Sequence, residues 1–202
     1  MKQFIAALPL LVLAACASTT PERGVEAATV VPNVDSWEEA ILPEDTVRLG
    51  RRAATWARAL EITETLSPDV LPVGGAALIP GNATAAVPAD GTYRCRTIKL
   101  GVESLGGVAY GWFRCRVFTE ADGKTWLVKD TGSQRQTGRI FADGTFLGGL
   151  VLGDEEGSIG YGAITERNVV GVMERLSDGR YRLVQPEPVY ESMLDILELK
   201  AA

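Results

Sequence analysis

The segment GTYRCRTIKL at residues 91–100 opens the part of the chain that decides the fold, and GWFRCRVFTE at residues 111–120 has the same character. Apolar and polar residues alternate in both, as is typical of β-strands with one buried face. Further short strands follow, separated by turn signals such as Asp122-Gly123 and Asp143-Gly144. The expected strands are 92–100, 108–119, 124–131, 136–142, 145–152, 158–164, 168–176 and 180–185, while 193–200 is expected as a closing strand or a short helix.

This pattern predicts a mainly β fold, a small antiparallel barrel or sandwich of about eight strands. Closing the sheet into a barrel removes the unpaired edges that an open sheet would expose, so we favour the barrel. The chain has 202 residues, and residues 35–202 are expected to form a single globular domain, with the β-meander over 91–200.

One amphipathic helix, expected over 44–62, precedes the strands. Its apolar stripe consists of Leu49, Ala53, Trp56 and Leu60, which are spaced at intervals of three and four residues. The stretch 67–90 follows and is rich in Pro, Gly and Ala without any period. Because it also contains several large apolar residues, we expect it to pack as a strap across one end of the core.

The N-terminus resembles that of a bacterial lipoprotein. Lys2 precedes an apolar run, and LAAC at residues 13–16 is similar to a lipobox, in which the cysteine thiol receives a lipid. We therefore expect residues 1–15 to be a signal peptide, Cys16 to be lipidated and residues 16–34 to be a flexible membrane tether. The expected location is the bacterial cell envelope, at the outer membrane facing the periplasm.

The composition excludes several classes of function. The chain has 20 Lys and Arg against 26 Asp and Glu, a net charge of −6, which argues against nucleic acid as a partner. It contains no histidine, which removes Ser-His-Asp and Cys-His catalysis and histidine-ligated zinc. Because no other catalytic constellation is recognisable, we expect neither an enzyme nor a cofactor.

The cysteine count predicts one disulfide. If Cys16 carries lipid, Cys95 and Cys115 remain as a pair, and an oxidising compartment favours their bond. Closing that loop stabilises the fold by roughly 3 kcal/mol in the chain-entropy model. If the two cysteines lie directly opposite each other on antiparallel strands, every pair of residues that face each other across these strands has numbers that sum to 210.

That register gathers four arginines on the face opposite the cysteines, together with Trp112. The arginines are either solvated or paired with carboxylates of the chain, or they line a concave site that binds an anionic group. A polar run at 131–139 contains Arg135, which could form the rim of such a site. The candidate ligand-binding residues are therefore Arg94, Arg96, Arg114, Arg116, Trp112 and Arg135.

Several motifs together resemble one bacterial family, which is catalogued as domain of unknown function 4893. They are GTYRCRTIKLG at 91–101, GSQR at 132–135, ER at 166–167, VG at 170–171, RLV at 182–184, PEP at 186–188 and ESMLD at 191–195. The resemblance covers roughly residues 35–199. It implies an envelope protein with no assigned activity, and it carries over no functional residues.

The leading hypothesis is a non-catalytic, lipid-anchored envelope domain that binds a small ligand or another envelope component. Its expected partners are the membrane, through the lipid on Cys16, and an envelope ligand or protein of unknown identity. The alternative is a periplasmic inhibitor of a secreted protease or lysozyme, with the strap 67–90 or the tail 17–34 inserted into the enzyme. An enzyme that uses carboxylates or a Ser-Arg arrangement is the least favoured class.

Overall fold

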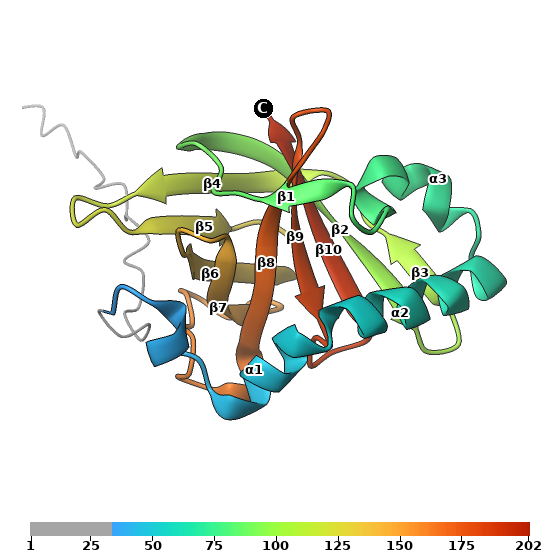
Figure 1. Ribbon diagram of the computed structural model, residues 1–202, viewed down its shortest axis with the longest axis horizontal. Helices are drawn as coiled ribbons and strands as arrows, with labels where there is room; N and C mark the ends of the chain where they lie inside the picture. The colour runs from blue at the N-terminus through green and yellow to red at the C-terminus, as the bar shows by residue number, and fades with distance from the viewer. Residues whose placement is uncertain (1–33) are drawn as a thin grey trace, which may run out of the picture.

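The computed structural model describes residues 34–202 and contains a closed antiparallel barrel of eight strands (Figure 1). Around the barrel the order is β8-β7-β6-β5-β4-β2-β10-β9, and pairing of β9 with β8 closes it. These strands are β2 (Gly91–Val102), β4 (Phe113–Thr119), β5 (Thr125–Lys129), β6 (Gln134–Ile140), β7 (Thr145–Leu152), β8 (Asn168–Leu176), β9 (Tyr181–Pro186) and β10 (Leu194–Ala201). The predicted mainly β barrel is confirmed, and the last segment forms its closing strand.

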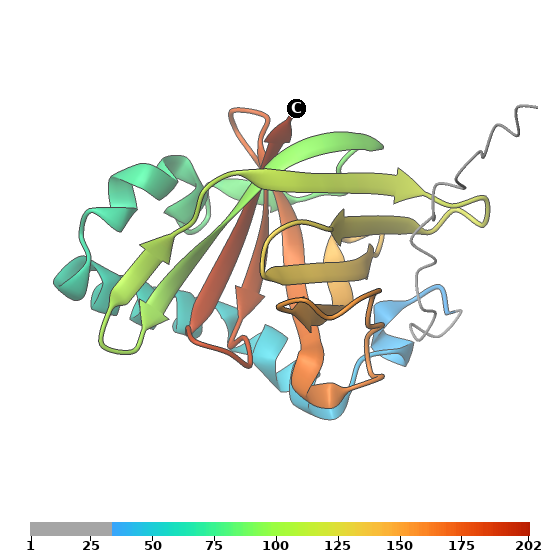
Figure 2. The same ribbon diagram turned by 180° about the vertical axis from the view of Figure 1, so that it is seen from behind.

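Two shorter strands lie outside the barrel circuit. β1 (Ala83–Ala85), which is labelled in Figure 1, pairs with the end of β8. β3 (Gly106–Ala109) pairs with the second half of β2 (Figure 2). The pairing between β4 and β2 covers only the first half of β2 and ends at the Cys95–Phe113 pair. On that side, the second half of β2 is therefore paired with β3 instead of β4.

Three sequence expectations about strands need correction. The expected strand 108–119 is divided between β3 and β4, because residues 110–112 leave the sheet. The expected strand 158–164 forms turns and irregular structure instead. β1 lies within the stretch 67–90, where no strand was expected.

The helices cover the outside of the barrel (Figure 1). They are α1 (Pro43–Gly50), α2 (Arg52–Leu66) and α3 (Val70–Gly74), with 3-10 turns at Trp37–Glu39 (η1), Gly75–Leu78 (η2) and Thr165–Arg167 (η3). The expected single helix over 44–62 is therefore wrong. α1 contacts β8 while α2 contacts β2, β9 and β10, and the break between the helices lets both follow the curved wall.

Apolar side chains form three clusters. One fills the barrel interior and contains the two cysteines of the disulfide. A second lies between α2 and the outer wall of β2, β9 and β10, and a third lies under η1 and α1 against β5 to β8. Inside the barrel, a Cβ at Gly138 would lie 2.4 Å from the Phe146 ring, so glycine leaves the space that this ring fills.

The segment 67–90 packs along the outer wall rather than across one end of the core. Ala77 and Leu78 are buried beneath α2 in the second apolar cluster. Arg182 of β9 reaches this segment and donates to the carbonyl oxygens of Ala77 (3.0 Å) and Ile79 (2.8 Å), while Glu174 accepts from its Nε. The segment is thus held by polar as well as apolar contacts.

The predicted Cys95–Cys115 disulfide is present, with the two Cα atoms 5.9 Å apart. The predicted register is wrong by two residues, because Tyr93 lies opposite Cys115 and Cys95 lies opposite Phe113. The bond therefore runs diagonally between the strands and leaves an aromatic side chain opposite each cysteine. A shift of two residues keeps every side chain on its face, so all four arginines still lie outside the barrel.

Candidate functional site

One end of the barrel interior is polar, whereas the rest is filled by apolar side chains. The polar residues occupy the same alternate positions as core residues on their strands: Lys99 follows Cys95 by four residues, and Lys129 follows Leu127 by two. Inward-facing residues at this end are Thr97, Lys99, Lys129, Gln134, Gln136, Gln185 and Asp195. Because alternate residues of a strand point to the same side, these polar side chains point into the barrel interior.

Lys99 and Asp195 form a buried ion pair across β2 and β10. They are register partners, and Lys99 Nζ lies 2.9 Å from Asp195 Oδ2. The Ser192 hydroxyl donates to Asp195 Oδ1 at 2.5 Å. Burial raises the pKa of the Asp195 carboxyl, and the Lys99 ammonium opposes that shift. The charge of Lys99 is thus balanced within the site.

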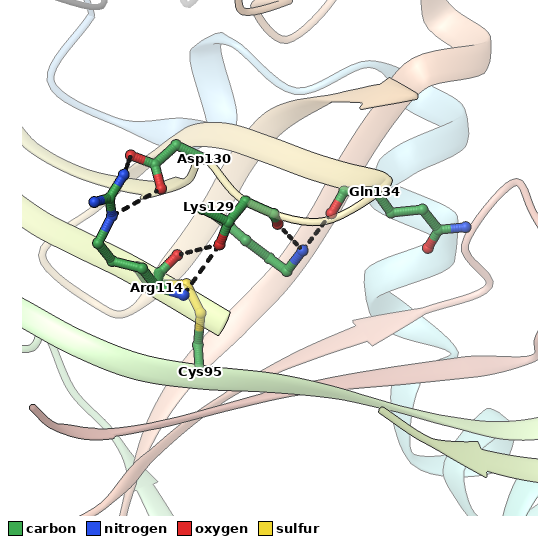
Figure 3. Close-up of a disulfide and its surroundings, with 7 residues drawn as sticks. Cys95, Arg114, Lys129, Asp130 and Gln134 are labelled. Atoms are coloured by element: carbon green, nitrogen blue, oxygen red, sulfur yellow. Dashed lines mark hydrogen bonds and ion pairs between the residues drawn. A yellow bond between two sulfur atoms is a disulfide. The ribbon is translucent and has the colours of Figure 1, made fainter. Parts of the chain in front are cut away.

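Lys129 lacks such a balance. Lys129 is only 4% exposed, and its Nζ donates hydrogen bonds to the carbonyl oxygens of Thr131 (2.8 Å) and Gln134 (Figure 3). Nζ also lies 4.6 Å from the centre of the Phe113 ring. Among residues 34–202, no carboxylate forms an ion pair with this ammonium. Burial, reinforced by the charges of Arg135 and Lys99 and partly opposed by the more distant Asp130 carboxylate, lowers the pKa of Lys129 to about 8.

Two adjoining cavities of about 30 and 90 Å³ lie at this polar end. Thr97, Lys129 and Gln134 line both of them. The charged residues lining the smaller cavity are four bases, Arg48, Lys99, Lys129 and Arg167, and two acids, Glu166 and Asp195. Arg48 pairs with Asp45, Arg167 with Glu155 and Lys99 with Asp195. Of the bases in this lining, Lys129 alone has no carboxylate partner within residues 34–202.

The connection between β9 and β10, residues 187–193, contributes to both cavities. Its Tyr190 lines the smaller cavity and its Glu191 the larger. Glu191 Oε2 lies 3.5 Å from Lys99 Nζ and accepts a hydrogen bond from Gln134 Nε2 at 3.2 Å. Glu187 and Glu191 have positive φ angles of 47° and 73°, which are costly for residues other than glycine. The contacts of Glu191 thus hold a strained loop over the site.

The residues singled out from the sequence lie elsewhere. The four arginines lie on the outer face of the wall, where Arg96 pairs with Glu198 and Arg114 with Asp130. Arg135 faces outward from β6 and donates to the carbonyl oxygen of Gly153 at 3.2 Å. None of the six candidates, Trp112 included, lines either cavity at the polar end. Their role in ligand binding stays a prediction.

Sequence reasoning missed the polar end itself. The signal available in the sequence was a lysine at one of the alternate strand positions that otherwise carry buried apolar residues, as at Lys99 and Lys129. Gln136, Gln185 and Asp195 occupy core positions in the same way. A charged residue in such a position needs a partner or a ligand, which distinguishes it from solvated arginines.

Comparison with known proteins gives one match. A family model described as a domain of unknown function, DUF4893, matches residues 37–199. No curated protein and no solved structure matches the chain.

The described part of the chain contains neither a membrane-spanning helix nor a metal-ligand cluster. Within residues 34–202, no helix combines the length and apolarity needed to cross a membrane. In the same range, no three Cys, Asp or Glu side chains are grouped so that they could hold a metal ion. The predicted lipidation site, Cys16, lies outside the described residues, as do the signal peptide 1–15 and all but the last residue of the tether 16–34.

Proposed function

Because the chain belongs to the family of domain of unknown function 4893, whose description names no activity, we propose a function from the site itself. The polar end of the barrel binds a small oxyanion, the carboxylate or phosphate group of a ligand, and performs no chemistry on it. The observation that carries this proposal is the buried ammonium of Lys129, which has no carboxylate partner in the described chain.

Binding an anion would correct the charge imbalance at Lys129. An ammonium group has three N–H donors, and two of those of Lys129 are directed at backbone carbonyls. A buried charge without a counter-charge is costly, and a hydrogen bond from an ammonium to an oxyanion is among the stronger ones. The third donor therefore suits an anionic ligand better than a neutral one.

The size of the site limits what it holds. Cavities of about 30 and 90 Å³ are small beside the roughly 300–1,000 Å³ of pockets that enclose whole ligands. They suit an anionic head group whose remainder lies outside or displaces the loop 187–193. Glu191 supports this interpretation, because its carboxylate already lies against Lys99 and Gln134.

The proposal retains the membrane anchor expected from the sequence. LAAC at 13–16 supports lipidation of Cys16, and the tether 16–34 would hold the domain near the membrane. The Cys95–Cys115 disulfide suits an oxidising compartment such as the periplasm. We therefore propose a ligand-binding domain of the bacterial envelope, facing the periplasm at the outer membrane.

The inhibitor hypothesis gains no support from residues 34–202. It required the segment 67–90 or the tail to insert into an enzyme, but the segment is packed against the outer wall by Ala77, Leu78 and Arg182. The tail 17–34 lies almost entirely outside the described residues. We therefore argue for ligand binding alone.

Replacing Glu191 by Gln is expected to tighten anion binding. The Glu191 carboxylate lines the larger cavity together with Lys129, so it competes with an anion there, and removing this partly exposed charge should strengthen affinity by about 3- to 10-fold. Isothermal titration calorimetry with acetate, hexanoate and inorganic phosphate measures this and separates carboxylate from phosphate ligands. Glu64→Gln, on the exposed side of α2, changes the charge equally and should leave affinity unchanged. Equal or weaker binding by Glu191→Gln, or no binding of any probe, would contradict the proposal.

A further inference from the structure

A row of positive charges crosses the outer wall of the barrel. Lys200 of β10 lies opposite Arg94 of β2, and Arg94 lies opposite Arg114 of β4. All three occupy outward positions, which alternate with the buried Cys95, Cys115 and Leu199. Like charges directly opposite on neighbouring strands destabilise a sheet, so this arrangement requires an explanation.

Two cations of the row have no carboxylate partner. Arg114 pairs with Asp130, with Nη2 3.2 Å from Oδ2 (Figure 3). Neither Arg94 nor Lys200 forms an ion pair with any carboxylate of residues 34–202. The chain is acidic overall, with carboxylates in excess, so this local shortage is specific to the patch.

Trp112 lies at the centre of the same surface. Its ring centre is 4.3 Å from Lys200 Nζ, 4.6 Å from the Arg96 guanidinium and 5.6 Å from the Arg94 guanidinium. The indole is half-buried, and it belongs to residues 110–112, which leave the sheet between β3 and β4. We call Arg94, Trp112, Arg114 and Lys200 the tryptophan patch.

We propose that the tryptophan patch docks on an anionic lipid surface. Arg and Lys attract the phosphate groups of such a surface, and Trp favours the zone between water and hydrocarbon. A specific protein partner would contact roughly 20–30 residues on each side, far more than this patch supplies. The patch lines neither cavity of the polar end, so this inference is separate from the anion site and does not depend on it.

The acidic remainder of the surface would give the contact an orientation. An anionic membrane repels a chain with a net charge of −6 everywhere except where cations prevail. Docking through Arg94 and Lys200 would therefore fix which side of the barrel faces the lipid.

Tryptophan quenching in vesicles tests the proposal. The full chain carrying Cys16→Ser, which cannot be acylated at that position, is mixed with brominated phosphatidylcholine vesicles with or without phosphatidylglycerol. We expect quenching of Trp112 emission only with phosphatidylglycerol, and its loss in Trp112→Phe. Arg94→Glu with Lys200→Glu should weaken vesicle binding at least about 25-fold, at roughly fivefold for each basic side chain lost.

Arg58→Glu with Lys124→Glu is the matched control, because it makes the same charge change at α2 and at the β4–β5 turn. We expect this control to bind phosphatidylglycerol vesicles as the parent does. Equal binding with and without phosphatidylglycerol, or quenching that persists in Trp112→Phe, would overturn the proposal. Capture of an acidic protein through the patch without vesicle binding would overturn the lipid assignment.

Discussion

Replacing Lys129 by Met is expected to weaken the binding of acetate and phosphate by about 10- to 100-fold, because a hydrogen bond to a charged group contributes roughly 1.5–3 kcal/mol. Methionine keeps the length of the aliphatic side chain but removes the ammonium that is to contact the ligand. Isothermal titration calorimetry at pH 7 measures the loss. Lys124→Met, in the turn between β4 and β5, removes the same charge far from the cavities and should bind as the parent does.

The Lys129→Met protein should remain folded. At pH 7 the ammonium is charged in both the folded and unfolded states, so a folded-state pKa of about 8, well below that of an ordinary lysine, represents a cost of roughly 3 kcal/mol that methionine removes. The substitution also leaves the carbonyl oxygens of Thr131 and Gln134 without this donor, which costs about 1–3 kcal/mol. We expect the free energy of unfolding to change by less than about 2 kcal/mol, since the two effects oppose each other. Unchanged anion affinity in a folded Lys129→Met protein would contradict the assignment.

Replacing Asp45 by Ala is expected to destabilise the fold by about 3–5 kcal/mol, because it removes one partner of a buried ion pair. Asp45 is 2% exposed and accepts from Arg48 Nη1 (2.6 Å), the Tyr161 hydroxyl (2.6 Å) and Asn168 Nδ2 (2.9 Å). The Tyr161 hydroxyl also accepts from the amide of Leu42, and the pKa of Tyr161 is raised by burial and by the hydrogen bond to Asp45. Denaturant unfolding measures the change.

Two further variants distinguish the loss of the Asp45 hydrogen bonds from a general effect of removing a carboxylate from α1. Glu44→Ala removes the neighbouring but exposed carboxylate of α1 and should change stability by less than about 0.5 kcal/mol. Asp45→Asn keeps the shape and one acceptor oxygen, so an intermediate loss is expected. If Asp45→Ala were no less stable than Glu44→Ala, the network would not hold α1 to β8 as described.

The sequence was sufficient for the architecture because the barrel depends on alternation and turns, which are local. It failed where tertiary contacts override the local pattern. Residues 158–164 alternate like a strand, yet the Tyr161 side chain turns to Asp45 of α1. β1 contains only three residues, too few for a period to be visible. The register of β2 and β4 depended on residues 110–112, which leave the sheet; Gly111 is a local sign of irregularity there, but it does not determine how far the register shifts.

The candidate site was less predictable than the fold. The four arginines that flank Cys95 and Cys115 were predicted to share one face, and this is confirmed, but that face is the outer wall. The cavities, however, depend on which strands meet at one end of a closed barrel. Lys99, Lys129 and Asp195 come from three strands far apart in sequence, and only closure brings them together. The alternation of each strand predicts that these side chains point into the barrel, but it does not predict that they lie close to one another.

The most direct test of the central claim is a pH titration of the Lys129 side chain by NMR, in lysine-labelled protein with Lys129→Arg for assignment. We predict that its signal titrates near pH 8 in the free protein and at a higher pH with saturating acetate or phosphate, because an anion favours the charged form. By linkage, acetate affinity should change little between about pH 6 and pH 7 and fall by up to about tenfold per pH unit above pH 8. A Lys129 signal that titrates near pH 10.4, as an ordinary lysine does, and is unmoved by either anion would contradict the account.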